Sequence, residues 1–103
     1  MAGLSYPPFR ASTQLVRASE NNPWLKQGAK GGGVGVMQGA LMDLGYPMPI
    51  TLAKWGRPDG LFGSETYRTV QRFQGDHKLS VDGIAGRMTI HALDTLKAGG
   101  APA

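Results

Sequence analysis

Apolar residues recur at helical spacing in three stretches of the chain, all beyond residue 33. Steps of three and four residues place them on one face of a helix in each stretch. The three faces are Val34, Met37, Leu41 and Leu44, then Thr66, Val70 and Phe73, and last Thr89, Ala92, Leu93 and Leu96. The pattern predicts an all-α fold, a small three-helix bundle over residues 34–97 with a flexible tail over residues 98–103.

A motif that occurs twice precedes the second and third predicted helices. The segment from Asp59 to Thr66 recurs 23 residues later as the segment from Asp82 to Thr89, with the Asp, both Gly and the Thr identical. An Asp side chain accepts hydrogen bonds from the backbone N–H groups that follow it, and the next glycine supplies the positive φ of a tight turn. Each DGxxG motif is therefore predicted to be a turn that starts a helix, with the Thr bonding back across the first helical turn.

The first predicted helix ends at a glycine and leads into a proline-rich loop. Gly45 suits the left-handed position after a helix, and Tyr46 is placed to make the apolar contact that accompanies such an end. Residues 47–58 contain three prolines together with Ile50, Leu52 and Trp55. We expect these apolar side chains to tether the loop to the core.

Residues 1–33 show no sustained helical or strand period and end in a glycine-rich run. They are predicted to form an irregular N-terminal arm and linker, with room for a short helical turn at residues 11–18. Trp24 and Leu25 are expected to fold back onto the domain as an anchor, because exposing both would be costly.

Composition narrows the classes of function. The chain has 103 residues, enough for one domain, and a net charge of +4, of which residues 1–33 carry +3. A nucleic-acid-binding domain usually concentrates Lys and Arg on its folded part among aromatic residues, so no nucleic-acid partner is predicted. The absence of Cys excludes disulfides and thiolate chemistry, and His77 and His91 lack ligand spacing. We therefore predict no metal site and no cofactor.

The beginning of the chain lacks the apolar segment of a secretory signal, and no run approaches transmembrane length. We expect a protein made in the cytoplasm without a signal peptide, with no membrane partner.

Taken in order, these motifs closely resemble the peptidoglycan-binding domain family with three helices. The matching residues are Val34, Met37, Gln38, Leu41, Leu44, Gly45 and Tyr46, then Asp59, Gly60, Phe62, Gly63, Thr66, Val70, Phe73 and Gln74, then Leu79, Asp82, Gly83, Gly86, Thr89 and Leu93. The resemblance covers residues 34 to about 96 and implies binding to the bacterial cell wall, not a reaction. The apolar face of the second helix places its end near Gln74 or Asp76. Lys78 stands where the family usually has Gly, which favours an end at Gly75 instead.

Most of the matched residues are explained by folding. The Asp and Thr residues of the two motifs are expected to serve turns and helix starts, and Gln38 and Gln74 to bond to loop backbone. Glycosidases need two acidic groups at a defined separation, and Glu65 with Asp59 or Asp82 could be imagined there, but the turn explanation is simpler. We predict no catalytic residue and no enzyme activity.

A wall ligand offers amide, carboxylate and hydroxyl groups, so its binding surface should present cations and an aromatic platform. The predicted ligand-binding residues are Tyr46, Trp55, Phe62, Tyr67, Arg68 and Arg72. The alternative is that Tyr46 and Phe62 belong to the core and that the arginines are merely solvated.

Two functions are consistent with these residues and motifs. The first is a non-catalytic module that binds peptidoglycan, through its glycan or its stem peptide, and anchors a protein or an assembly to the wall. The second is an adaptor in a phage-tail-like or contractile injection particle, with residues 1–33 contacting a particle or enzyme partner. Deletion of residues 1–30 is expected to distinguish them, because an adaptor needs the arm ordered against a partner, whereas a wall-binding module can lose it harmlessly.

Overall fold

The computed structural model describes residues 4–48 and 59–99, and within these ranges it contains five helices and no β-strand. The helices are α1 (Pro7–Arg10), α2 (Thr13–Ser19), α3 (Gly32–Asp43), α5 (Ser64–Asp76) and α6 (Arg87–Lys97). The predicted all-α fold is confirmed. In the described part of the chain, no helix is both long and apolar enough to cross a membrane.

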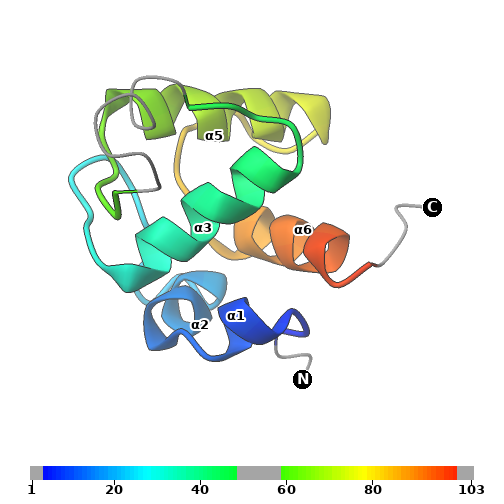
Figure 1. The fold of residues 1–103 in the computed structure, drawn as a ribbon. Coiled ribbons are helices and arrows are strands. Elements are labelled where there is room, and N and C mark those ends of the chain that lie inside the picture. Colours follow the sequence, from blue (N-terminus) through cyan, green and yellow to red (C-terminus); the bar gives the residue numbers. More distant parts are fainter. Residues whose placement is uncertain (1–3, 49–58, 100–103) are drawn as a thin grey trace.

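The three helices predicted from periodicity are α3, α5 and α6. Helix α3 lies between α5 on one side and α1 and α2 on the other, and α6 packs against both α2 and α3 (Figure 1). Most of the side chains expected on the inner faces are fully buried, among them Val34, Met37, Leu41, Val70, Phe73 and Leu93, whereas Leu44, Ala92 and Leu96 are half-buried against the core. Their burial is the main source of stability, since each contributes roughly 1.5–3 kcal/mol of transfer free energy.

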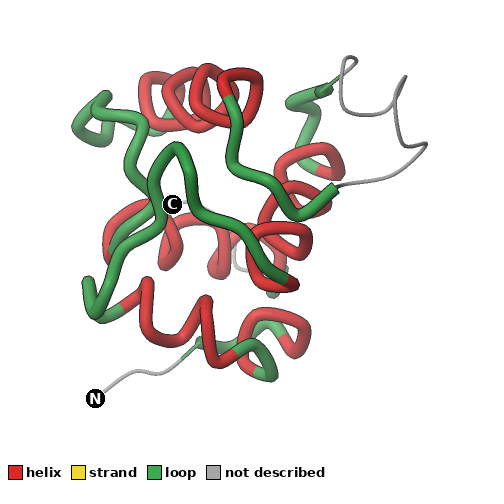
Figure 2. The backbone as a smooth tube through the Cα atoms, turned by 90° about the vertical axis from the view of Figure 1, so that its left-hand side faces the viewer, coloured by secondary structure: helices red, strands yellow, loops and turns green. Residues whose placement is uncertain are grey.

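The irregular N-terminal arm is a wrong prediction. Residues 4–19 form two short helices that cover α3 and α6, as the tube of Figure 2 also shows. Phe9, Leu15 and Ala18 have no exposed surface and belong to the same core as α3, α5 and α6. The short helical turn expected at residues 11–18 is present as α2, but α1 was not predicted, because a helix of four residues is too short to show a repeat.

Two polar side chains hold the N-terminal segment in place. The buried carboxylate of Asp94 in α6 accepts the backbone N–H groups of Ser5 (2.9 and 3.0 Å) and Tyr6 (2.8 Å) at the start of α1. Ser12 accepts the N–H of Leu15 and so caps α2.

The glycine-rich segment before α3 pairs with both DGxxG turns and is not a free linker. Leu25 exchanges two backbone hydrogen bonds with Ala85 of the second turn, at 3.0 and 2.7 Å. Further along, Phe62 donates to Ala29 (2.9 Å) and Gly31 donates to Gly60 (3.0 Å) of the first turn. One segment, residues 25–31, thus joins the starts of α5 and α6.

The end of α3 lies where the sequence predicts it, whereas α5 continues past Gly75. After α3, Gly45 has φ +95° and the Tyr46 N–H bonds to Leu41 O, which is the predicted left-handed end. Helix α5 does not end at Gly75. It continues to Asp76, and Lys78 adopts the left-handed conformation with φ +60°.

Candidate functional site

A buried glutamine organises the second DGxxG turn. The Nε2 amide of Gln74 lies within hydrogen-bond distance of Asp82 Oδ1 (2.9 Å), Ile84 O (3.0 Å) and Thr89 Oγ1 (3.0 Å). Its Oε1 accepts the N–H of Gly83 at 2.9 Å. Asp82 Oδ1 also accepts the N–H of Ile84, as the sequence predicted for an Asp that starts a turn.

The first turn repeats this arrangement around Gln38. The Nε2 of Gln38 reaches Asp59 Oδ1 (3.1 Å), Leu61 O (2.9 Å) and Thr66 Oγ1 (2.9 Å), and its Oε1 accepts the Gly60 N–H at 2.9 Å. The prediction that both glutamines bond to loop backbone is confirmed. The threonines serve mainly as acceptors for the glutamines, since their distances to the backbone oxygens of Leu61 and Ile84 are both 3.5 Å.

The two turns differ in what covers them. Met48, from the loop after α3, is fully buried with its sulfur 3.7 Å from Thr66 Oγ1, so this side chain fills the space beside the first turn. The chain between α5 and the second turn is much shorter, and beside Thr89 lies an open groove of about 510 Å³. Within the described residues, Met48 thus packs against the first turn, whereas the second turn borders an open groove.

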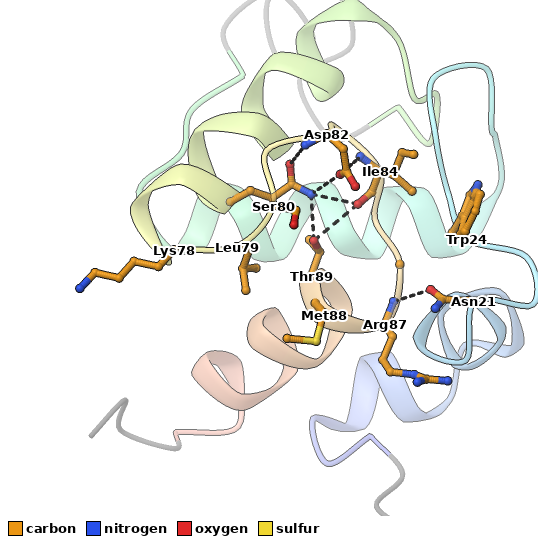
Figure 3. A pocket seen from close by; sticks show the side chains of 12 residues that line it. Asn21, Trp24, Lys78, Leu79, Ser80, Asp82, Ile84, Arg87, Met88 and Thr89 are labelled. Atoms are coloured by element: carbon orange, nitrogen blue, oxygen red, sulfur yellow. Dashed lines mark hydrogen bonds between the residues drawn. The ribbon is translucent and has the colours of Figure 1, made fainter.

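This groove, which we call the turn groove, runs between Asn21 and Trp24 on one side and the segment 78–89 on the other. Figure 3 shows Lys78 and Trp24 at opposite ends, with Asp82 and Thr89 between them. Trp24 is 47% exposed and Met88 is 67% exposed, which makes both apolar side chains accessible to a ligand.

The charge of the turn groove favours an anionic ligand. Arg87 and Lys78 are exposed on its walls, and neither forms a salt bridge within the described residues. The acid that lines the groove is Asp82, whose Oδ1 is already bonded to Gln74 and Ile84. The backbone at Arg87 is fixed because its N–H donates to Asn21 Oδ1 at 2.8 Å.

The predicted ligand-binding residues do not form one surface. Phe62 (2% exposed) and Tyr46 (8% exposed) are core side chains, because they fill space beside the helices, and they provide no exposed platform. The Tyr46 hydroxyl donates to Asp76 at 2.7 Å, and Arg72 lies 5.8 Å from the centre of the Tyr46 ring. Trp55 lies outside the described residues.

Tyr67 and Arg68 lie on the same helix but in different surroundings. Tyr67 is half-buried against Gly83, whereas Arg68 is exposed, as is Arg72. The two arginines thus remain a predicted binding surface on α5, and of the aromatic residues expected beside them Tyr46 and Phe62 are buried.

Sequence reasoning missed the exposed residues of the turn groove. Leu25 is buried as expected, but its neighbour Trp24 faces outward. Met88 could have indicated this exposed surface, because it is an apolar residue that lies one position before Thr89 and off the apolar face of α6. Among the described residues no cluster of His, Asp and Glu is arranged to hold a metal ion.

Comparison with known proteins places these features in a family. The model of a putative peptidoglycan binding domain matches residues 30–93. The chain belongs to this family. Its N-terminal helices precede the matched segment, whereas both glutamine-centred turns lie inside it.

A curated relative and three solved structures share the matched part. An N-acetylmuramoyl-L-alanine amidase, CwlL of Bacillus licheniformis, is 46% identical over 67 residues, which cover 65% of this chain and 18% of the amidase. The crystal structure of the SleB N-terminal domain is 32% identical with a TM-score of 0.62, covering 75% of this chain and 96% of that one.

A peptidoglycan-binding protein from Clostridioides difficile, solved in complex with glutamine hydroxamate, is 35% identical with a TM-score of 0.62, covering 72% of this chain and 42% of that one. The endolysin of Burkholderia phage AP3 is 33% identical with a TM-score of 0.58, covering 68% of this chain and 24% of that one. The chain thus spans less than a fifth of the amidase and shares only the family domain with it.

Proposed function

We propose that this domain binds peptidoglycan in the turn groove without cutting it, and so holds the protein at the bacterial cell wall. The proposal is based on the open groove beside the second turn. Trp24 and Met88 are exposed in this groove, and Lys78 and Arg87 lie beside them. Neither cation forms a salt bridge within the described residues. The family membership gives the ligand class, and the groove gives a surface on which this ligand can lie.

The chemistry of the groove suits a polymer of sugars and short peptides. The exposed face of Trp24 offers an apolar platform to a sugar ring, whose C–H groups lie on its faces and whose hydroxyls lie at its rim. Arg87 and Lys78 offer charge-assisted hydrogen bonds to carboxylates of the ligand. A groove of about 510 Å³ lies within the usual range for small-ligand sites.

Four aspartates support binding over catalysis, because hydrogen bonds of the fold occupy their carboxylates. Asp59 and Asp82 hold the turns, Asp94 holds the N-terminal segment, and Asp76 accepts the Tyr46 hydroxyl. A glycosidase needs one carboxylic acid that can give up its proton and a second carboxylate beside the scissile bond. Neither role suits carboxylates that are committed to backbone N–H groups and to a tyrosine.

The test is co-sedimentation of the purified chain with insoluble peptidoglycan, with soluble muropeptides measured in the same tube. We expect binding without release. Trp24→Ala and Met88→Ala should each weaken binding about tenfold, roughly the effect of losing one buried aromatic or thioether contact. Leu61→Ala is the matched control, since Leu61 is 48% exposed at the first turn and does not line the turn groove.

The same assay tests the predicted arginine surface on α5. If Arg68→Ala and Arg72→Ala weaken binding while Trp24→Ala does not, the ligand lies on α5 and the turn groove is the wrong site. Release of muropeptides by the chain alone would contradict the non-catalytic role. Failure to sediment over several wall types and salt concentrations would contradict wall binding and favour the adaptor function.

A further inference from the structure

The turn groove continues past Met88 into a second hollow between α2 and α6. This hollow, which we call the helix groove, has a volume of about 730 Å³. Leu79, Arg87 and Met88 line both hollows, so the two are contiguous. The helix groove is otherwise lined by Leu4, Val16, Ser19, Glu20, His91, Ala92 and Thr95.

The two hollows differ in chemistry. The turn groove holds an aromatic platform and the polar groups of the second turn, whereas the walls of the helix groove are mostly aliphatic, from Leu4, Val16 and Ala92. Two opposite charges lie on the helix groove, Arg87 where the hollows meet and Glu20 at the end of α2. Neither side chain forms a salt bridge within the described residues.

We propose that the helix groove binds the stem peptide of peptidoglycan while the turn groove binds the sugar to which that peptide is attached. The inference rests on the proposed function and assigns the two chemical halves of one ligand to two contiguous hollows. A stem peptide is short, carries several carboxylates and, at its diamino acid, an amino group on an aliphatic chain. Arg87 matches a carboxylate, Glu20 matches the amino group, and the aliphatic walls match the methyl and methylene groups between them.

Arg87 is well placed to recognise a carboxylate of the stem peptide, because its own backbone and that of Gly86 contact Asn21. Its N–H is bonded to Asn21, and the preceding Gly86 packs so closely against Asn21 that a Cβ there would overlap the amide oxygen. The guanidinium therefore starts from a fixed point at the junction of the hollows, and less conformational entropy is lost when it binds a carboxylate.

The proposal is tested with two separate probes on the full chain. One is a synthetic stem tripeptide of L-alanine, γ-linked D-glutamate and diaminopimelic acid, and the other is glycan strands stripped of peptide. Binding of each is measured by NMR chemical-shift titration at millimolar concentration. We expect the tripeptide to shift signals of α2 and α6 around Glu20 and Thr95, and the glycan to shift the Trp24 indole.

The variants separate the two hollows. Arg87→Gln keeps the backbone N–H and should weaken tripeptide binding about tenfold, since a hydrogen bond to a charged group is lost, while glycan binding changes less than about twofold. Trp24→Ala should weaken glycan binding about tenfold and change tripeptide binding by less than about twofold. Thr95→Glu adds a carboxylate to the rim of the helix groove alone and should weaken tripeptide binding, whereas the neutral Thr95→Gln should not.

The outcomes distinguish this inference from the proposed function. If intact peptidoglycan sediments with the chain but the tripeptide shifts no signal of the helix groove, the inference fails and wall binding stands. Tripeptide binding that is insensitive to both Arg87→Gln and Thr95→Glu would also overturn it. If neither intact peptidoglycan nor either probe binds, the proposed function itself fails.

Discussion

At the scale of single residues, the backbone conformation of Lys78 is the clearest departure from what its side chain prefers. The left-handed conformation costs a residue with a Cβ about 1 kcal/mol relative to glycine. Lys78 adopts it because the end of α5 requires it: the Leu79 N–H must turn back to reach Gln74 O at 2.8 Å.

Replacing Lys78 by Gly should therefore raise the free energy of unfolding by about 1 kcal/mol, less the entropy gained by the more flexible unfolded chain. Urea unfolding followed by circular dichroism measures the change. Lys78→Ala is the control, because it removes the same amine and keeps the Cβ. An equal gain from both variants would show that charge, not backbone conformation, is responsible.

Gly83 is constrained both by its backbone and by its neighbour. It has φ +72°, and an added Cβ would overlap the ring of Tyr67. We expect Gly83→Ala to lower the free energy of unfolding by at least about 2 kcal/mol, from left-handed strain and overpacking together. Gly63→Ala should have little effect, since no atom lies within 4 Å of a Cβ there.

A double variant separates the two contributions at Gly83. Tyr67→Ala opens the space beside the glycine. Gly83→Ala should therefore lower the free energy of unfolding by less in the Tyr67→Ala protein than in the original one, and the difference is the contribution of the overlap with the Tyr67 ring. An equal loss of unfolding free energy with and without the Tyr67 ring would contradict the contribution of packing against the ring.

The Tyr46 hydroxyl couples stability to alkaline pH. Burial and the hydrogen bond to Asp76 raise the pKa of Tyr46 to about 12, whereas in the unfolded chain it is near 10. The folded protein holds this proton more tightly than the unfolded chain. The contribution to stability is therefore complete below about pH 10 and is lost as the pH rises from about 10 to about 12.

Comparison with Tyr46→Phe isolates this effect. The variant should be less stable than the original protein at about pH 8, and the difference should shrink between about pH 10 and pH 12. The raised pKa of Lys97, which results mainly from its hydrogen bond to Asp43, acts in the same direction in both proteins and cancels. A stability difference that stays constant across this range would contradict the assignment.

At the scale of elements, the short N-terminal helices are structural parts of the domain. They bury Phe9 and Leu15 completely against α3 and α6. Phe9→Ala should lower the free energy of unfolding by about 3–5 kcal/mol, the usual cost of a buried Phe, and Arg10→Ala, at an exposed neighbour, by less than about 0.5 kcal/mol. Thermal or urea unfolding measures both.

Because these N-terminal side chains are buried, a deletion of the N-terminal residues would disturb folding as well as any contact with a partner. Removing residues 1–30 takes away Leu4, Phe9, Leu15, Ala18 and Leu25 from the core, so the remaining chain should lose its helical circular dichroism instead of merely losing a partner. Point variants in the turn groove are therefore the better way to separate wall binding from contact with a partner protein.

At the scale of the whole molecule, one core joins all five described helices, and residues 25–31 pair with both DGxxG turns. Unfolding should accordingly be a single cooperative transition. Hydrogen exchange tests this directly: the slowest amides of α2 and of α5 should report the same free energy of opening. A lower value for α2 would show that residues 4–31 unfold separately from the rest.

The sequence by itself determined the parts of the fold that depend on neighbours along the chain. The faces of α3, α5 and α6 follow from the helical period, the turns from Asp and Gly side by side, and the end of α3 from Gly45, because each uses contacts within a few residues. The use of Gln38 and Gln74 as turn organisers was also readable, since two long amides stood beside buried positions before the two turns.

Only the tertiary structure decided which surfaces stay open. Helices α1 and α2 form, and Phe9, Leu15 and Ala18 are buried, because this segment covers apolar faces of α3 and α6 that are distant in the sequence. Tyr46 and Phe62 are in the core and Trp24 is on the surface because of what packs beside them, although an aromatic residue suits either place. Met48 closes the first turn, and no equivalent among the described residues closes the second. Two nearly identical sequence motifs therefore have different surroundings, and the groove beside the second turn is where we propose that the ligand binds.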